Sequence, residues 1–277
     1  MKVAMVTPMA SRSAIADVMS QAVPELSRHW DLDVWCPSEP DLRSAPYPLH
    51  VFDGPDSRVV SRLKSYDLVM HVLGNSAFHR RIVPLVRACP GLVVLHDAAM
   101  ADLLLMTAGD DGRLDELVEY VRLAYGSGRA ELLQRHGELG GSAEWLRLVA
   151  EVPLTELVTQ SALGAVVHSR WHAAQVDGLM LGEVTVAPLP VPSTKLGLED
   201  VDHGRSAELL ADLPTDALLA VTVGEVNANR GLGALLDAMA GAPELERLHL
   251  WAVGGGAAGA VARATAESLG LGDRFAL

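Results

Sequence analysis

Short apolar runs alternate with helical patterns along most of this chain, and this alternation limits the folds that it can adopt. Runs at Lys2–Val6, Asp67–Val72 and Leu92–Leu95 have the length and composition of buried strands. Segments such as Ala14–Arg28 lie between them and repeat apolar residues at helical spacing. Strands that alternate with helices form parallel sheets joined by right-handed crossovers. We therefore predict an α/β chain built from Rossmann-like βαβ units.

A proline-rich stretch divides the chain into two expected domains. Three prolines lie between positions 188 and 192 and lead into a Gly-containing, acidic segment. We place the boundary at about Pro190, which gives an N-terminal domain at 1–190 and a C-terminal domain at 191–277. The N-terminal domain is expected to contain a mostly helical insert at Ala98–Ala162.

The C-terminal domain has fewer predicted elements than a complete doubly wound domain. We expect strands at Leu218–Val223 and Leu248–Val253 and the beginning of another at Arg274–Leu277. This is roughly half of the set that such a domain uses, so the second domain is expected to be incomplete. A half-sheet has an open edge, which leaves room for self-association or for a covering partner.

Charge and cysteine content narrow the classes of partner and site. The chain has 22 basic and 35 acidic residues, a formal charge of −13, so it lacks the basic footprint of a general nucleic-acid binder. Cys36 and Cys89 fit no metal-ligand spacing, and the ten histidines are scattered. We expect no metal site. Thiols of this kind, and the lack of an apolar run long enough to cross a bilayer, favour a soluble cytoplasmic protein.

The segment Ala220–Ala240 has the pattern of a strand, a loop and the start of a helix. Gly224 ends the apolar run, and Arg230 and Gly231 come directly before the helical pattern. Backbone N–H groups at a helix start are unpaired and the helix dipole is positive there. Such a loop suits an anion, and Arg230 would add charge-assisted donors. An ordinary turn with a solvated arginine is the alternative.

This segment resembles the first βα unit of the second domain in retaining GT-B glycosyltransferases that use nucleotide sugars (glycosyltransferase family 4-like). In that family a strand-end Gly, an Arg and a Lys-Gly pair hold the donor diphosphate. Gly224 matches the strand-end Gly, and Arg230 with Gly231 match the Lys-Gly pair. Glu225 stands where the family has its Arg, and a carboxylate beside a diphosphate repels it unless it turns away.

Two loops of the first domain carry further matches to this family. Ser13 and Ala14 begin a run that resembles the family's Ser-Gly-Ile-Ala-Asp loop, although Ala14 replaces a Gly that would allow closer backbone approach. Gly74, Asn75 and Ser76 match the Gly-Asn-Ser feature of one branch, with a histidine one turn further on. The resemblance implies that these residues bind the acceptor or substrate hydroxyls. Ordinary helix capping is the alternative.

His96 and Asp97 emerge together at the end of the strand Leu92–Leu95. A strand-end histidine can donate to a sugar hydroxyl or to a developing charge. The family commonly has a His here, close to the transferred sugar, so the resemblance makes His96 the candidate catalytic residue. Asp97 is assigned to the acceptor, with orientation of His96 or helix capping as alternatives. His168, in a Val-His-Ser run that the family often shows, is interpreted as a sign of the fold.

The resemblance implies a retaining glycosyltransferase that moves a sugar from a nucleotide diphosphate sugar to a sugar, lipid-linked or natural-product acceptor. It also implies no cofactor and no bound metal. The family's Glu-x7-Glu segment comes later in the second domain, beyond Leu277, so we expect an incomplete donor site and a chain that is weakly active or inactive alone. A non-catalytic module or partner subunit is the rival interpretation, which Glu225 and Ala14 favour. An NAD-linked enzyme or epimerase is disfavoured because Gly254–Gly256 lacks the dinucleotide fingerprint spacing.

Overall fold

The computed structural model describes residues 1–139, 142–190, 207–208, 210–224, 226, 231–256 and 258–277. The chain divides into two compact units. Unit 1 contains Met1–Glu138 and Arg147–Ser193, and unit 2 contains Leu139–Leu146 and Thr194–Leu277. The domain boundary at about Pro190 stays a prediction.

Unit 1 is built on a parallel sheet of seven strands in the order β3-β2-β1-β4-β5-β6-β7. Its strands are β1 (Lys2–Val6), β2 (Asp31–Pro37), β3 (Leu49–Phe52), β4 (Leu68–Leu73), β5 (Leu92–Leu95), β6 (Gly164–Val167) and β7 (Glu183–Val186). The order turns back on itself between β1 and β4, which pair in parallel register. The alternation of strands and helices in the sequence therefore forms the doubly wound sheet that it predicts.

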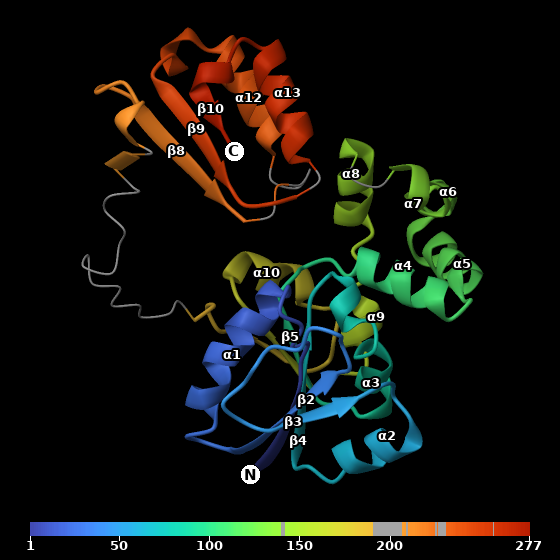
Figure 1. Cartoon of the computed structure of the whole chain (residues 1–277). Coiled ribbons are helices and arrows are strands. Elements are labelled where there is room, and N and C mark those ends of the chain that lie inside the picture. Colours follow the sequence, from blue (N-terminus) through green and yellow to red (C-terminus); the bar gives the residue numbers. More distant parts are fainter. Residues whose placement is uncertain (140–141, 191–206, 209, 225, 227–230, 257) are drawn as a thin grey trace. The chain divides into compact units, whose positions relative to one another are not determined.

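The helices of unit 1 cover both faces of this sheet. Figure 1 shows α1 (Ala14–Leu26) on one side of the sheet, and α2 (Ser57–Leu63) and α3 (Val83–Ala88) on the other. The helix α10 (Arg170–Val176) connects β6 to β7. Each of α1, α2 and α10 begins with a side-chain cap, because a Ser or Asp oxygen accepts a backbone N–H of the first turn.

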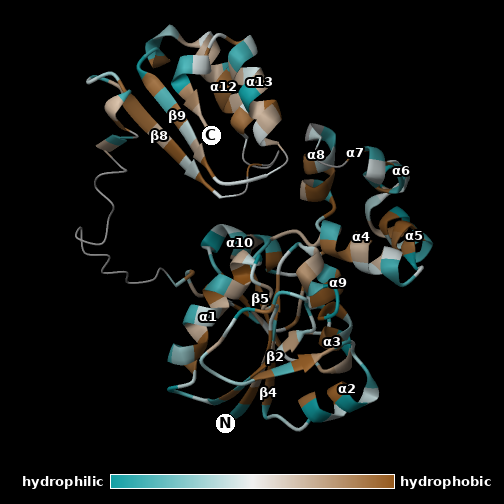
Figure 2. Cartoon of the chain, in the orientation of Figure 1, coloured by the Kyte–Doolittle hydropathy of each residue, from teal (hydrophilic) through white to brown (hydrophobic). Residues whose placement is uncertain are grey.

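The core lies on both faces because the central strands β1, β4 and β5 are apolar in nearly every position, as buried parallel strands require. On the α1 face, Val3 and Met5 of β1 pack with Met70 and Val72 of β4 and with Met19 of the helix. Figure 2 shows this contrast: the strands of unit 1 are mostly hydrophobic, whereas the helices carry hydrophilic residues along part of their surface. The helices are amphipathic because one side packs on the sheet and the other meets water.

The expected helical insert follows β5. It contains α4 (Ala101–Asp110), α5 (Leu114–Tyr125), α6 (Ser127–Gln134), α7 (His136–Leu139), α8 (Ala143–Glu151) and α9 (Glu156–Thr159). Gly126 separates α5 from α6 with a backbone φ of 96°, a conformation that side-chain-bearing residues rarely adopt. Gly126 is therefore a helix boundary within the insert.

Unit 2 has a parallel sheet of three strands in the order β10-β9-β8. The elements are β8 (Leu218–Val223), α12 (Leu232–Gly241), η4 (Pro243–Leu245), β9 (Leu248–Val253), α13 (Gly259–Ser268), η5 (Gly272–Arg274) and β10 (Phe275–Ala276). Leu236 and Met239 of α12 pack with Leu250 of β9 and Phe275 of β10. The edge strand β8 exposes Val221 by 51% and Val223 by 68%.

One helix of unit 1 begins later than the sequence predicts. The sequence predicts a helix over His79–Arg87, whereas the chain forms the short 3-10 turn η1 (Ala77–His79) and begins α3 only at Val83. Pro84 lies in the first turn of α3, where its missing N–H and fixed φ are tolerated. A helix that began at His79 would place this ring in its interior, where it breaks a hydrogen bond and clashes with the preceding turn.

Among the described residues, no helix is long and apolar enough to cross a membrane.

Candidate active site

The sheet order brings the loops after β1, β4, β5 and β6 to one edge of unit 1, because these four strands are neighbours and parallel. Ligands of open α/β sheets bind outside the carboxyl ends of the strands, at the point where the strand order reverses. The reversal lies between β1 and β4. The predicted residues of unit 1 all lie in these loops or directly after them.

The loop after β1 ends in a helix cap. The Ser13 Oγ accepts the backbone N–H of Ala16 at 3.3 Å, and Ser13 is only 4% exposed. Ala14 is the first residue of α1 and is exposed. The capping alternative therefore describes the Ser13 side chain, while binding of a substrate by Ser13 or Ala14 stays a prediction.

The loop after β4 is tied to the start of α4 by Asn75. The Asn75 Oδ1 accepts the backbone N–H of Leu103 at 2.9 Å, and its Nδ2 donates to the Asp102 carboxylate at 2.7 Å. Ser76 is the cap residue of η1 but makes no side-chain cap hydrogen bond. The Asn75 side chain therefore joins the loop after β4 to the first turn of α4. Its part in substrate binding, like that of Ser76, stays a prediction.

Gly74 lies where several groups of the site converge. A methyl group added at Gly74 would lie 3.1 Å from Asp97 Oδ2, 3.1 Å from His79 Nε2 and 2.3 Å from the end of Ile15. Contacts this short require neighbouring side chains to shift. The glycine thus lets the loop after β4 approach the loop after β5 and the helix α1.

His96 and Asp97 follow β5 as expected. The backbone N–H of His96 donates to the Leu73 carbonyl at 2.9 Å, which continues the pairing of β4 with β5. The Asp97 carboxylate accepts the backbone N–H of Asn75 at 2.7 Å, and Asp97 is exposed. Asp97 therefore holds the neighbouring loop and still presents a carboxylate at the surface.

The segment before α9 supports the loop after β5 in a strained conformation. Leu154 has a φ of 58°, the one positive value among the described non-glycine residues. On its two sides, the Pro153 carbonyl accepts the Met100 N–H at 2.7 Å, and the Thr155 hydroxyl donates to the Ala98 carbonyl at 2.6 Å. Backbone strain of this kind costs about 1–3 kcal/mol and tends to occur near functional sites.

A cluster of four histidines, His79, His96, His168 and His172, lies at the ends of β4, β5 and β6. The rings of His96 and His168 are 4.5 Å apart between centroids. The Nε2 atom of each of the four histidines is buried and has no hydrogen-bond partner among the described residues. Unpaired buried polar groups cost about 1–3 kcal/mol each, so four in one cluster mark a candidate binding site.

Hydrogen bonds determine which nitrogen of two rings carries the proton. Nδ1 of His79 lies 3.0 Å from the Val72 carbonyl, and Nδ1 of His168 lies 2.8 Å from the Ala187 carbonyl. A carbonyl oxygen can only accept, so each Nδ1 donates and, in the neutral ring, each Nε2 is left as an acceptor. His79 and His168 therefore offer acceptor nitrogens to a ligand that brings O–H or N–H donors.

Burial keeps the rings of His79 and His96 uncharged at physiological pH. Burial lowers the pKa of His79 to about 4, against a hydrogen bond with the Val72 carbonyl that raises it. Burial, followed by the charges of His168, His79 and His172, lowers the pKa of His96 to about 3. His96 is therefore a neutral hydrogen-bonding group at physiological pH, and it does not act as a cation that compensates phosphate charge.

His79 and His172 are the residues that sequence reasoning did not assign to the site. His172 follows the cap residue Ser169, whose Oγ accepts its backbone N–H at 3.0 Å, and burial lowers its pKa. A signal was present in the sequence: each histidine lies within one helical turn of a strand-end loop. The sequence does not show that β4 and β6 lie on the two sides of β5. This strand order brings the rings of His79 and His172 to His96.

The predicted donor residues of unit 2 are only partly described. Gly224 ends β8 with a φ of 121°, and Gly231 precedes α12 with a φ of 65°. Glu225 and Arg230 lie outside the described residues. A methyl group at Gly254 would lie 2.0 Å from the Gly224 carbonyl oxygen, so the two strand-end loops approach each other closely because Gly254 has no side chain.

Among the described residues, no group of three or more His, Cys, Asp and Glu side chains is arranged to hold a metal ion. This holds for the histidine cluster as well, although its four Nε2 atoms lack partners among the described residues.

The fold resembles that of solved glycosyltransferases. WaaG, a glycosyltransferase involved in lipopolysaccharide biosynthesis, aligns over 99% of this chain and 69% of its own, with a TM-score of 0.51 and 15% identity. The apo form of the lipopolysaccharide outer core galactosyltransferase WaaB aligns over 99% and 67%, with a TM-score of 0.46 and 12% identity. UGT2 of Phytolacca americana, complexed with UDP-2-fluoro-glucose and pterostilbene, aligns over 100% and 70%, with a TM-score of 0.43 and 14% identity.

The likeness to WaaG is one of fold, and it confirms the predicted α/β architecture of GT-B type with two Rossmann-like parts. The sequence matches no protein-family model, and no curated protein matches it.

Proposed function

We propose that this chain transfers a sugar from a nucleotide diphosphate sugar to a hydroxyl-bearing acceptor, with retention of the anomeric configuration. The observation that carries the proposal is the histidine cluster at the carboxyl ends of β4, β5 and β6, whose Nε2 atoms lack partners. Sugar hydroxyls are donors that suit such acceptor nitrogens. The GT-B type of fold is compatible with this chemistry. Because fold alone does not determine function, the proposal rests on the histidine cluster.

In this proposal unit 1 binds the acceptor side. His96 hydrogen-bonds to the sugar hydroxyls as a neutral group, and Asp97, which is exposed, accepts a hydrogen bond from a hydroxyl of the acceptor. Ser13, Ala14, Asn75 and Ser76 shape the surrounding loops. Retention is proposed on the resemblance of the segment Gly224–Gly231 to the retaining family.

The donor diphosphate is assigned to unit 2. Gly231 precedes α12, whose first N–H groups and positive dipole end suit an anion. Arg230 supplies charge-assisted donors, and Gly224 allows close approach of the backbone. The charge of the diphosphate is then compensated without a metal or another cofactor.

The test of the acceptor side is the variant His96→Ala. Single-turnover assays with a panel of nucleotide sugars should show slow transfer or hydrolysis by the natural chain, and the variant should be slower by about 10²-fold or more. The exposed His29 is the matched control, because His29→Ala removes an imidazole without touching the cluster. Equal rates for His96→Ala and the natural chain would reject the role of His96.

The rival function is a non-catalytic module or partner subunit, and donor binding separates it from the transferase. Calorimetric titration with uridine, guanosine and adenosine diphosphates should show binding that Arg230→Ala weakens at least about tenfold. Absence of affinity for all three in both proteins would favour the module. Self-association through the open edge of unit 2, and a cytoplasmic location, stay predictions.

A further inference from the structure

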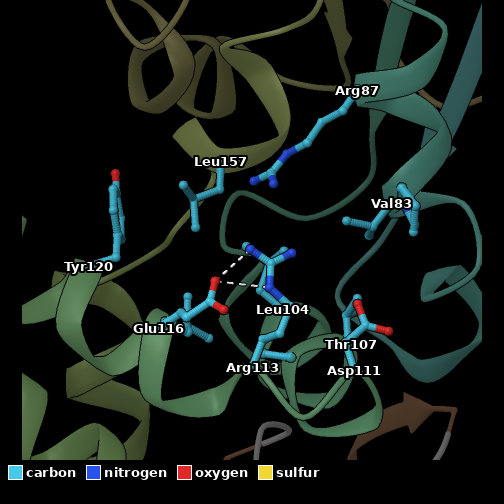
Figure 3. A pocket seen from close by; sticks show the side chains of 12 residues that line it. Val83, Arg87, Leu104, Thr107, Asp111, Arg113, Glu116, Tyr120 and Leu157 are labelled. Atoms are coloured by element: carbon cyan, nitrogen blue, oxygen red, sulfur yellow. Dashed lines mark hydrogen bonds and ion pairs between the residues drawn. The ribbon is translucent and has the colours of Figure 1, made fainter.

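Unit 1 contains a cavity that is separate from the histidine cluster. It has a volume of about 400 Å³ and lies among α3, α4, α5 and α9 (Figure 3). The apolar part of its lining consists of Val83, Pro84, Leu104, Ala108, Leu117 and Leu157. Small-molecule sites are typically concave, mostly apolar spaces of roughly 300–1,000 Å³ with a few polar groups, and this cavity has that size and composition.

Two guanidinium groups converge on this apolar space. Figure 3 shows the Arg87 side chain extending from α3 into the space between Leu157 and Arg113. Arg87 makes no hydrogen bond and no ion pair with the described residues. A guanidinium without a counter-charge beside an apolar space favours the binding of an anion.

The second cation is already neutralised within the protein. The Nε and Nη2 atoms of Arg113 both donate to one oxygen of Glu116, at 2.9 and 2.6 Å, and Figure 3 draws this pair as dashed lines. Asp111 also lines the cavity and lies beside Thr107. The positive charge of the cavity that has no partner among the described residues is therefore that of Arg87, an exposed residue. The Asp111 carboxylate interacts electrostatically with Arg113.

We propose that this cavity binds a small amphiphile with one anionic head, a carboxylate or a phosphate monoester, and a short apolar chain. Arg87 pairs with the head through the planar fork that matches both anions. Leu104 and Leu157 contact the chain, whose burial supplies the hydrophobic part of the affinity. The site is independent of sugar transfer, and its test needs no nucleotide sugar.

Octanoate and octyl phosphate, both below the concentrations at which they form micelles, are the probes for calorimetric titration. The natural chain should bind at least one of them with one-to-one stoichiometry, and neutral octanol at least about tenfold more weakly because it cannot pair with a guanidinium. The stronger of the two anions identifies the head group. Binding of neither anion, or equal binding of octanol, would overturn the proposal.

Variants locate the site. Arg87→Ala should weaken binding of the anion at least about tenfold, whereas Arg147→Ala, which removes an exposed arginine outside the cavity lining, should leave it unchanged. Ala108→Phe should abolish binding by filling the cavity, and Asp111→Asn should strengthen it by removing the opposing charge. Unchanged affinity in folded Arg87→Ala protein, checked by circular dichroism, would place the anion elsewhere and overturn the proposal.

Discussion

Asn75 shows how a residue assigned to substrate binding is also used by the fold. Both polar ends of its side chain are engaged by α4, and its backbone N–H donates to Asp97. The same few hydrogen bonds thus hold the loop after β4, the carboxylate at position 97 and the start of the helical insert. A substitution at this residue is expected first to lower stability, because the Leu103 N–H and the Asp102 carboxylate each lose their hydrogen bond with Asn75.

Asn75→Ala should lower the free energy of unfolding by about 1–3 kcal/mol, since it leaves the Leu103 N–H and the Asp102 carboxylate without this partner. Urea unfolding followed by circular dichroism measures the difference. Ser76→Ala is the matched control, because Ser76 makes no side-chain cap hydrogen bond, and it should change stability by no more than about 0.5 kcal/mol. Similar effects of the two variants would contradict this account.

At the scale of elements, helix starts determine where the cluster residues lie. The helix α10 has seven residues, too few to be stable without tertiary packing or a good cap. Ser169 provides the cap by accepting the His172 N–H, so the same hydrogen bond positions a histidine of the cluster. The start of α3 is determined by Pro84, because a proline is tolerated in the first turn of a helix and not in its interior.

Ser169→Ala should destabilise the protein by about 1 kcal/mol through loss of this cap, and Ser169→Asp should restore most of it because Asp caps helices about as well as Ser. Thermal unfolding of the natural chain and of the two variants measures their order of stability. If Ser169→Asp were as unstable as Ser169→Ala, the exposed Ser169 side chain would not be acting as a cap.

At the scale of the whole molecule, buried neutral histidines make the fold sensitive to acid. Burial lowers the pKa of His71 to about 4, against a hydrogen bond with the Cys89 carbonyl, and His79 and His96 are lowered in the same way. Because these values lie below the pKa of about 6.5 in an unfolded chain, the unfolded state binds protons first as the pH falls. Stability is therefore full above about pH 6.5 and is lost progressively towards pH 4.

His71→Gln should reduce this acid sensitivity. A pKa that falls from about 6.5 to about 4 corresponds to roughly 3 kcal/mol of stability lost on acidification, and glutamine keeps a donor for the Cys89 carbonyl without titrating. Urea unfolding at pH about 7 and at pH about 4.5 measures the loss in each protein. The exposed His29→Gln serves as control, and a loss in His71→Gln as large as in the natural chain would show that His71 does not contribute.

Local pattern was sufficient for most elements of the fold. Leu92–Leu95 and Leu218–Val223 are strands with the predicted ends, because a short apolar run between polar turns has few other stable conformations. Part of the candidate site could be predicted from the sequence for the same reason. His96 and Asp97 follow a recognisable strand, so their place at its carboxyl end required no knowledge of the rest of the molecule.

The sequence by itself determined which segments are strands and helices, since hydrophobic period and turn residues act over a few neighbouring positions. Only the tertiary structure decided that β4 and β6 lie on the two sides of β5. This order brings His79 and His172 to His96 across long separations in the chain, and it leaves Arg87 beside a cavity of unit 1. These contacts depend on how whole elements pack against one another. The hydrophobic period of a segment reflects only residues close together in the chain, so it does not predict contacts between distant segments.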